Sequence, residues 1–433
     1  MNRKAYYADF IYFDNQLHKD SYLLVIGDKI QGISQHADEE GASGYEIEHF
    51  HNSAIFPGLI NTHTHLPMVF FRGMADDLEF LDWLQNHIWP AESKWLSEEF
   101  ILSATELAAV EMIKSGTTIS NDMYFLSDTI ASVIKNSGLK AVIGAGVLDF
   151  PTKFGKGIDD YIDKAGDLYL KYKDCKQIDV SVCPHAPYTV NPDNYVKCVE
   201  FCAKHDILLH THLVEAANER GDSIEKYGKS TVQIMDEVGA FDLEKSIFAH
   251  CVHPTPEEIE LMGSKNVNVA LNIQSNMKLA NGFAPVKAML EAGCNLTIGT
   301  DGAASNNDLD LISEMQSLAL TQKGIEKDPT VLPAEDVLKM GTVNGAKGLG
   351  INKTGELKRG NLADFIVVSF DEPHMTPVYN PVSHLVYCAK STDVTHTYVN
   401  GKCLMRDREI LTLDENKIKE DARRWGQKIM ENK

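Results

Sequence analysis

The chain has 433 residues, 43% of them hydrophobic, which is enough to bury a large core around one dominant domain. Its formal net charge of −21 repels polyphosphates and anionic lipid surfaces, and no lysine- and arginine-rich run offsets it, so we expect neither nucleic acid nor a membrane as partner. Asp9 and Asp14 precede any long apolar stretch, unlike a signal peptide, and no segment reaches the roughly 18 uncharged apolar residues of a membrane helix. The 8 cysteines, from Cys175 to Cys403, form no Cys-x-x-Cys pair, which indicates free thiols and a cytoplasmic location.

The chain opens with short strand patterns joined by turns, from residue 6 to about residue 50. Beyond residue 55, β-branched runs alternate with longer helical patterns, which is typical of parallel βαβ units. The expected strands are Ala54–Asn61, Gly116–Asp122, Ala141–Leu148, Asp179–Cys183, Ile207–His212, Ser246–Cys251, Asn266–Leu271 and Asn295–Thr300. Eight such strands are enough to close a (β/α)8 TIM-like barrel, an α/β fold.

Segments with apolar residues at helical spacing separate and follow these strands. The expected helices are Glu98–Lys114, Ser127–Asn136, Asp159–Tyr172, Pro192–His205, Pro256–Ser264, Ala284–Ala292, Asp308–Gln322 and Ala334–Leu349. Short strands return from roughly 355 to 412, and neither terminal set is long enough for a comfortable domain of its own. We therefore expect residues 1–56 and 355–415 to form one small β-sandwich, residues 57–354 the barrel, and residues 416–433 a C-terminal helix.

Polar residues with ligand chemistry stand where five of the barrel strands end. They are His63 and His65 on the first strand, His185 on the fourth, His212 on the fifth, His250 on the sixth and Asp301 on the eighth. A His-x-His pair alone is more often two hydrogen-bonded polar residues, and a lone strand-end aspartate is more often a helix cap. Because strand ends meet at one rim of a barrel, the joint pattern predicts a metal site there.

Alternation along the first strand sends His63 and His65 to the same side, so both can reach one ion about 2 Å away. His212 from across the barrel and Asp301 from the neighbouring strand complete a nitrogen and oxygen shell that suits zinc or ferrous iron. No cysteine pair shares this rim, so a thiolate site is excluded. A water on such an ion has a pKa near about 7, which makes hydroxide available at neutral pH.

Six segments extend the pattern around the histidines and Asp301. All of them resemble segments of amidohydrolase-superfamily deaminases. They are the run from Phe56 to Leu78, Pro184-His-Ala-Pro-Tyr, His210-Thr-His-Leu-Val-Glu, Ala249-His-Cys-Val-His, Ser275-Asn-Met-Lys-Leu-Ala-Asn-Gly and Gly299-Thr-Asp-Gly-Ala-Ala-Ser-Asn-Asn. Within that superfamily the sequence is most similar to the 5-methylthioadenosine/S-adenosylhomocysteine deaminases, which are related to the triazine hydrolases. The resemblance covers nearly the whole chain and implies a barrel of the metal-dependent hydrolase type.

The resemblance also implies a set of ligands and catalytic roles. One divalent metal, zinc first and iron second, is held by His63, His65, His212 and Asp301, because no lysine ends the fourth strand to bridge a second ion. Asp301 accepts a proton from the water and passes one to the departing amine, and His250 orients the water. Glu215 donates a proton to the ring nitrogen beside the attacked carbon, since that nitrogen must take up the developing charge.

The implied substrate is an adenine nucleoside, converted to the inosine analogue with release of ammonia. Glu92 matches the residue that binds the ribose hydroxyls, His185 contacts the nucleoside, and Trp83, Trp89 and Met68 are candidates for the walls of the purine pocket. Some members of the family carry an arginine soon after the third strand for the homocysteine carboxylate, whereas this chain has only Lys153 and Lys156 there, which lack the bidentate fork. Methylthioadenosine, 5'-deoxyadenosine or adenosine therefore fit better than S-adenosylhomocysteine.

Other readings of the same residues stay open. The site also suits another aminated or halogenated heterocycle, such as guanine or a triazine, and a metal-free assembly protein is a remote alternative. The segment Gly144-Ala-Gly-Val-Leu-Asp lacks the third glycine of a dinucleotide-binding loop, so an oxidoreductase is disfavoured. The resemblance implies a homo-oligomer, a dimer or tetramer.

Overall fold

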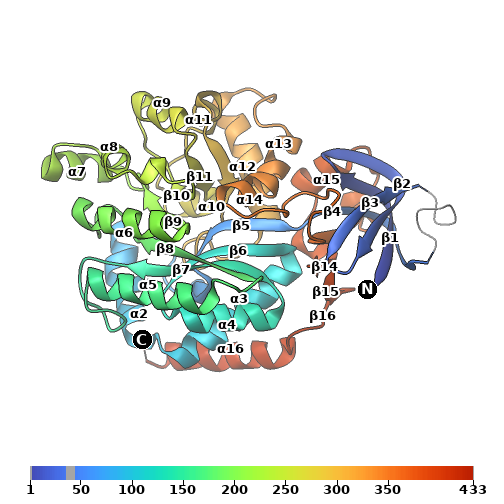
Figure 1. Cartoon of the computed structure of the whole chain (residues 1–433), viewed down its shortest axis with the longest axis horizontal. Coiled ribbons are helices and arrows are strands. Elements are labelled where there is room, and N and C mark those ends of the chain that lie inside the picture. Colours follow the sequence, from blue (N-terminus) through green and yellow to red (C-terminus); the bar gives the residue numbers. More distant parts are fainter. Residues whose placement is uncertain (1, 36–43, 433) are drawn as a thin grey trace.

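The computed structural model describes residues 2–35 and 44–432. Met1, residues 36–43 and Lys433, which the predicted sandwich and C-terminal helix ranges include, lie outside the described residues. Within the described part of the chain two eight-stranded sheets form, one from the middle of the sequence and one from both ends. Figure 1 shows them side by side, with the helices gathered around the first sheet.

The first sheet is the predicted parallel barrel. Its neighbours follow chain order: β5 (Leu59–Thr64), β6 (Thr117–Tyr124), β7 (Lys140–Val147), β8 (Ile178–Pro184), β9 (Leu208–Leu213), β10 (Ser246–His250), β11 (Asn268–Leu271) and β12 (Asn295–Ile298). Between β5 and β12 the barrel is closed by Thr62 Oγ1, which donates to the Ile298 carbonyl at 2.9 Å, and by the Asp301 amide, which donates to the His63 carbonyl at 3.0 Å. The (β/α)8 prediction is confirmed.

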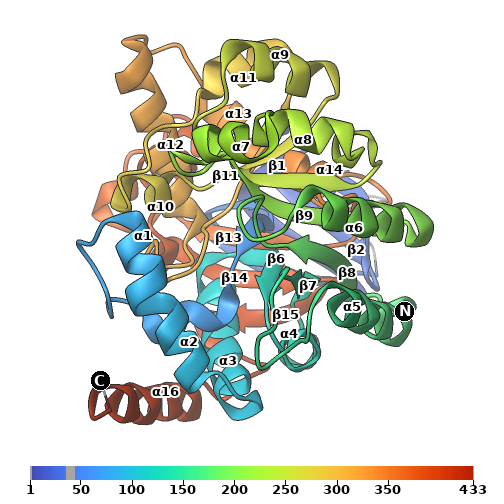
Figure 2. The same cartoon turned by 90° about the vertical axis from the view of Figure 1, so that its left-hand side faces the viewer.

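Helices surround the barrel strands, as Figure 2 shows. In chain order they are α1 (Phe80–Asp82), α2 (Trp89–Trp95), α3 (Glu98–Ser115), α4 (Ser127–Ser137), α5 (Ile158–Tyr172), α6 (Pro192–His205), α7 (Glu219–Tyr227), α8 (Thr231–Glu237), α9 (Pro256–Ser264), α10 (Ile273–Lys278), α11 (Val286–Ala292), α12 (Leu311–Glu326), α13 (Ala334–Met340) and α14 (Val343–Gly348). The single helix expected over Ala334–Leu349 was wrong: Thr342, with φ −137° and ψ −97°, separates α13 from α14.

The expected first strand, Ala54–Asn61, was also wrong, because it joins parts of two strands in different sheets. Residues 54–57 end β4 (Glu46–Pro57) in the terminal sheet, and β5 of the barrel begins at Leu59. Gly58 lies between them, where a Cβ would stand 2.3 Å from the Thr118 side chain. A larger residue therefore has no room at the point where the chain passes from one sheet to the other.

The second sheet is built from both ends of the chain. Its order is β16 (Glu409–Ile410), β15 (Lys402–Arg406), β14 (Val394–Val399), β13 (Phe365–Ser369), β4, β1 (Arg3–Phe13), β2 (Gln16–Ile26) and β3 (Lys29–Ser34). Three strand spacings, about 14 Å in a flat sheet, separate β1 from β14. The rings of Tyr6 and Tyr398 nevertheless lie 5.1 Å apart, so the sheet curls until its two halves face each other as a sandwich.

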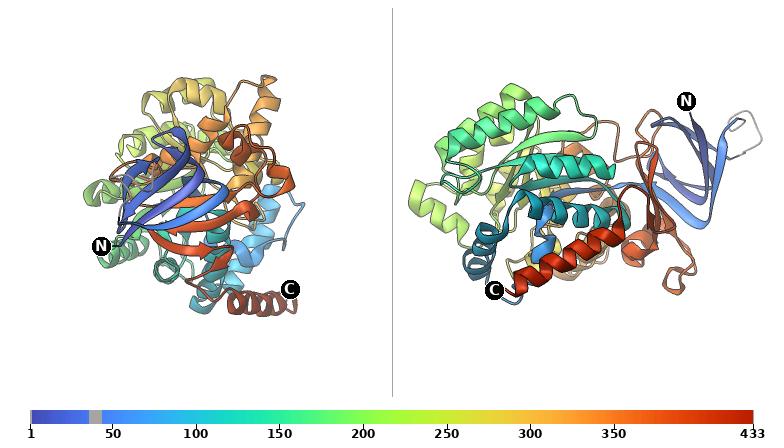
Figure 3. Two further views of the ribbon diagram at one scale, coloured as in Figure 1. Left: turned by 90° about the vertical axis from the view of Figure 1, so that its right-hand side faces the viewer. Right: turned by 90° about the horizontal axis from the view of Figure 1, so that it is seen from below.

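Part of the C-terminal region serves the barrel rather than the sandwich. Helix α15 (Pro381–Tyr387) packs against α12 and α13, and Gln316 donates a 2.6 Å hydrogen bond to the Tyr387 carbonyl. Helix α16 (Glu415–Met430) lies along α3, as the right-hand view of Figure 3 shows, and Trp425 packs on Phe100 at 5.3 Å. No helix in the described part of the chain is both long and apolar enough to cross a membrane.

Candidate active site

Four buried side chains at one end of the barrel converge on a single point. They are His63 on β5, His65 just after it, His212 on β9 and Asp301 after β12, and one ligand atom from each lies within 4.8 Å of all the others. Asp301 Oδ1 lies 3.4 Å from Nε2 of His63 and 3.2 Å from Nε2 of His65. The alternation of β5 therefore brings both histidines of the pair to the same carboxylate oxygen.

Backbone carbonyls fix two of these imidazoles. His65 Nδ1 donates to the Met123 carbonyl and His212 Nδ1 to the His185 carbonyl, each at 2.6 Å. Because a carbonyl oxygen only accepts, each ring carries its hydrogen on Nδ1 and presents Nε2 to the centre of the cluster. This is the arrangement that a histidine ligand to a metal requires.

Asp301 is held on both carboxylate oxygens. Ser275 and Ser305 donate to Oδ2 at 2.6 and 2.7 Å, and the Gly302 amide donates to Oδ1 at 2.8 Å. Burial alone would raise the pKa of this carboxyl, but the imidazoles of His63 and His65 bring it well below its usual range. Asp301 is therefore an anion among histidines.

Burial and the neighbouring Asp301 carboxylate shift the pKa values of the histidines in opposite directions. Burial lowers the pKa of His63 to about 3 and that of His212 well below its usual value. Burial also acts on His65, but the Asp301 carboxylate outweighs it and raises the pKa of His65 to about 9. Around the carboxylate stand neutral His63 and His212 and a protonated His65, whose Nε2 hydrogen a divalent cation would replace. With that hydrogen gone, three imidazole nitrogens and one carboxylate are the donor set that such a cation would use.

Glu215 and His250 stand beside the cluster with one end of each side chain fixed. His250 Nδ1 donates to Asn276 Oδ1 at 2.9 Å, and Asn281 Nδ2 donates to Glu215 Oε1 at 3.1 Å. Glu219 caps the turn that carries Glu215, since its carboxylate accepts from the Val214 and Glu215 amides. Burial raises the pKa of Glu215, which favours its acid form.

Three residues of this rim have left-handed backbone conformations. Val214 has φ 45°, His250 has φ 73° and Asp301 has φ 61°. Such angles cost about 1 to 3 kcal/mol in residues other than glycine, most of all in a β-branched one, and they gather at functional sites. These backbone conformations change the direction of the chain as it leaves strands β9, β10 and β12.

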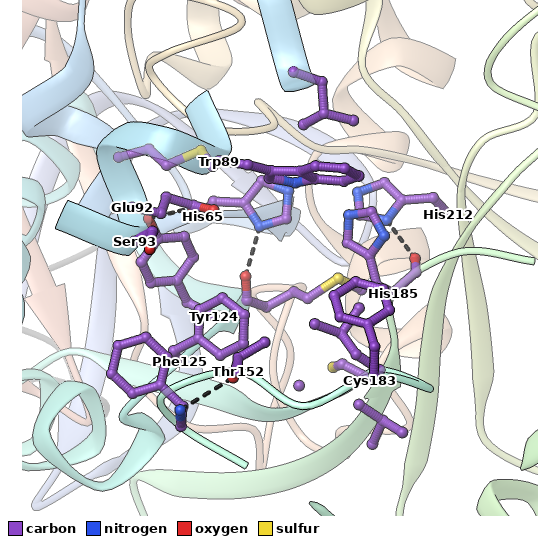
Figure 4. Close-up of a pocket in the computed structure, with 18 of the residues that line it drawn as sticks. His65, Trp89, Glu92, Ser93, Tyr124, Phe125, Thr152, Cys183, His185 and His212 are labelled. Atoms are coloured by element: carbon purple, nitrogen blue, oxygen red, sulfur yellow. Dashed lines mark hydrogen bonds between the residues drawn. The ribbon is translucent and has the colours of Figure 1, made fainter. Parts of the chain in front are cut away.

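A cavity of about 330 Å³ opens from the cluster. Its walls are mainly apolar and aromatic, and Figure 4 shows Trp89, Tyr124 and Phe125 on its lining together with His65 and His212. The candidate residues on its lining are His65, Met68, Trp83, Trp89, Glu92, His185, His212, Glu215, His250 and Asp301. The structure thus brings every candidate to one end of the barrel, with His63 just behind the lining; their roles stay predictions.

Two polar groups on the wall have a defined orientation. The Tyr124 hydroxyl donates to Glu92 Oε1 at 2.6 Å, and burial raises the pKa of Glu92 to about 7. His185 Nδ1 lies 3.0 Å from Thr189 Oγ1, whose own hydrogen goes to the Ala186 carbonyl, so Nδ1 is the donor. His185 consequently presents Nε2 as an acceptor.

Sequence reasoning missed the residues that hold the candidates in place. The segment Ser275-Asn-Met-Lys-Leu-Ala-Asn-Gly was noticed, but no role was assigned to it. Three of its side chains bind the candidates: Ser275 holds Asp301, Asn276 holds His250 and Asn281 holds Glu215. Tyr124, which contacts Glu92, carried no signal beyond its position at a strand end, and His210, which contacts His63, belongs to the quoted segment His210-Thr-His-Leu-Val-Glu but was given no role.

Comparison with known proteins agrees with this geometry. The model of the amidohydrolase family matches residues 54–404. The chain is 43% identical to a 5-methylthioadenosine/S-adenosylhomocysteine deaminase of Thermodesulfovibrio yellowstonii, over 87% of this chain and 86% of that protein. It is 42% identical to a 5'-deoxyadenosine deaminase of Methanosarcina barkeri, over 95% and 94% of the two chains. The crystal structure of a zinc-bound adenosine deaminase from Xanthomonas campestris superposes with a TM-score of 0.94 at 35% identity, over 99% and 98% of the two chains.

The fold and the site therefore define a hydrolase-type barrel, and the chain belongs to the amidohydrolase family. Its similarity to proteins named 5-methylthioadenosine/S-adenosylhomocysteine deaminase and 5'-deoxyadenosine deaminase extends along nearly the whole chain. The resemblance stated from the motifs is confirmed.

Proposed function

We propose that this protein is a metal-dependent deaminase that hydrolyses the amino group from the adenine ring of a nucleoside. The observation that carries the proposal is the cluster of three histidines and one aspartate at the floor of an aromatic cavity, with the acid Glu215 on the same lining. Relatives that are more than 40% identical along most of the chain carry the names of adenine-nucleoside deaminases.

The residues fit one divalent metal ion, and we propose zinc. His63 Nε2 is buried without a hydrogen-bond partner, although a buried polar atom normally has one. An ion held by His63, His65, His212 and Asp301 would give this nitrogen a partner with nitrogen and oxygen ligands that zinc accepts. When bound, the metal lowers the pKa of water that it holds.

The protein groups then supply the proton transfers. Asp301 takes a proton from the attacking water and later delivers one to the departing amine, so that ammonia leaves. Glu215 donates a proton to the ring nitrogen beside the attacked carbon, and burial keeps that acid available by raising its pKa. Nε2 of His250, which has no hydrogen-bond partner among the described residues, would hold the water in line with the ring.

The cavity walls favour a nucleoside with a short, uncharged 5' substituent. Aromatic side chains suit a purine face, and the Glu92 carboxylate can accept two hydrogen bonds from a ribose diol. Among the described residues that line the cavity, Lys153 is the one lysine or arginine, and its Nζ already donates to the Ser93 carbonyl at 3.2 Å. We therefore propose 5'-deoxyadenosine and methylthioadenosine as better substrates than S-adenosylhomocysteine.

The test is a side-by-side assay of the zinc-loaded protein. The ultraviolet change on conversion of adenine to hypoxanthine is followed for 5'-deoxyadenosine, methylthioadenosine, adenosine and S-adenosylhomocysteine, with guanine and melamine as heterocycle controls. We expect kcat/KM to be at least about tenfold higher for the first two than for S-adenosylhomocysteine, a difference of about 1.4 kcal/mol. No turnover of any adenosine derivative would overturn the proposal, and turnover of guanine or melamine alone would assign another ring.

A further inference from the structure

His210 lies directly behind the ligand cluster and has no part in the proposed reaction. It stands on β9, two residues before His212, and is fully buried at the centre of the barrel. Its Nε2 lies 2.7 Å from Nδ1 of His63, and the planes of the two rings are 86° apart with their centroids separated by 4.9 Å. This is a short contact between two imidazoles, of which only His63 reaches the ligand cluster.

The contact takes the place that a carbonyl oxygen occupies for the other two histidines. His65 and His212 each donate Nδ1–H to a backbone carbonyl, whereas His63 has the imidazole of His210 at that position. For Nε2 of His63 to offer its lone pair to an ion, the ring hydrogen must stay on Nδ1 and find an acceptor. His210 Nε2 is the acceptor that the structure provides.

The far edge of the His210 ring has polar neighbours that allow this arrangement. When Nε2 accepts, the ring hydrogen of His210 lies on Nδ1. Sγ of Cys183 lies 3.7 Å from that nitrogen, and Asn121 Nδ2 lies 3.1 Å from it while also donating to the Thr62 carbonyl. Asn121 Nδ2 can only donate, and a rotation of the amide would set Oδ1 against the Thr62 carbonyl, so the Cys183 thiol is the acceptor for the hydrogen on Nδ1 of His210.

We propose that His210 is a positioning residue of the metal site, which accepts a hydrogen bond from Nδ1 of His63 and so keeps Nε2 of His63 free and aimed at the ion. The inference rests on the proposed role of His63 as a metal ligand. A histidine that only filled the barrel interior would not need to meet a second imidazole at hydrogen-bond distance. Partners of this kind typically change metal affinity about 10- to 100-fold when they are removed.

The test uses two variants of nearly equal shape, His210→Gln and His210→Met. Glutamine keeps an oxygen that can accept from His63 Nδ1, whereas methionine fills the same space without a good acceptor. Metal-free protein is titrated with zinc against a competing chelator, and the melting temperature of the metal-free form is recorded. We expect His210→Met to bind zinc about 10- to 100-fold more weakly than the wild type, and His210→Gln to recover most of that loss at a similar melting temperature.

Zinc affinity of His210→Met equal to that of the wild type, or an equal loss in both variants, would overturn the inference. If neither variant folds, nitrogen-15 spectra of the zinc-loaded wild type with labelled histidines provide the test. A hydrogen on Nδ1 of His63 with none on Nε2 of His210 supports the inference, and the reverse arrangement refutes it. Failure of the proposed metal site gives a different result, because the wild type would then bind no zinc, or His63→Ala would bind it as tightly as the wild type. Failure of the proposed substrate is seen in the turnover assay and leaves zinc affinity unchanged.

Discussion

Nε2 of His250 and Oε2 of Glu215 lie 3.8 Å apart, each at the free end of a side chain whose other end is fixed. Asn276 holds Nδ1 of His250, and Asn281 holds Oε1 of Glu215. The two anchors come from one short segment, helix α10 and the turn after it. The segment therefore sets the distance between the two groups, which meet the same cavity from strands β9 and β10.

Replacement of Glu215 by glutamine tests the acid in this pair. The amide keeps the hydrogen bond with Asn281 after rotation but has no proton to give to the ring nitrogen. We expect kcat to fall about 10²- to 10⁴-fold, the usual contribution of a general acid, with zinc content unchanged. Steady-state kinetics with 5'-deoxyadenosine and metal analysis of the same sample make the measurement. Full activity of Glu215→Gln would remove the acid from the mechanism.

The pH dependence of the rate follows from the environment of Glu215. Burial raises its pKa, so the acid form persists above the usual range of a carboxyl group and is lost as the pH rises through the shifted value. We expect kcat/KM to decline on the alkaline side of its profile as Glu215 ionises. The residual activity of Glu215→Gln should not show that decline. A decline of the same shape in both proteins would assign it to another group.

Removal of the metal should cost both activity and stability. The three buried imidazoles and the carboxylate come together only in the folded chain, so an ion held by them would shift the unfolding equilibrium. At free zinc 1,000 times above the dissociation constant, we expect about 4.1 kcal/mol of added stability. Calorimetry of chelator-treated and zinc-reconstituted protein measures this, and parallel reconstitution with ferrous iron compares the two metals. Activity that survived complete metal removal would contradict the proposed mechanism.

The barrel and its candidate residues could be predicted because they depend on regular geometry. Parallel strands place their C-terminal ends at one rim, so histidines spaced far apart, such as His63 and His250, had to meet if the strands were correctly identified. The oligomeric state, the cytoplasmic location and the exact domain limits stay predictions.

Features that depend on close packing or on loop conformation were not predictable. The chain changes sheets at Gly58, where the Pro57-Gly58 pair and the predicted domain boundary mark a corner, but the apolar run on both sides of it reads as one strand. The roles of Ser275 and Asn281 arise from where α10 is placed relative to β12 and β9, which no local pattern records. Motif spacing identified the segment as distinctive without indicating which atoms it would hold.

The two serines on Asp301 provide a graded test of how that carboxylate is oriented. Ser275 and Ser305 both donate to Oδ2, so Ser275→Ala leaves one of the two bonds, and the double variant leaves neither. Each lost bond to a charged group costs about 1.5 to 3 kcal/mol. We expect kcat to fall about tenfold in each single variant and further in the double variant. Unchanged kcat in the double variant would show that the two serines do not orient Asp301 for the reaction.

Glu92 links substrate binding to stability, so replacement by glutamine should alter both. If its carboxylate accepts from the ribose hydroxyls, Glu92→Gln should raise KM for 5'-deoxyadenosine about tenfold or more, because a hydrogen bond to a charged group is lost. The KM for a 2',3'-dideoxy analogue, which has no diol, should change little. Equal changes for both substrates would indicate a general distortion of the cavity.

The stability effect of the same substitution has a defined sign. Burial raises the pKa of Glu92 from 4.5 to about 7, so the folded state favours the neutral acid. That contribution is fully present below about pH 4.5 and is lost as the pH rises through about 7. Glutamine is neutral at every pH and keeps a group beside Tyr124. The melting temperature of Glu92→Gln should therefore rise relative to that of the wild type as the pH increases from 5 to 8. A constant difference in melting temperature across that range would mean that Glu92 does not titrate there.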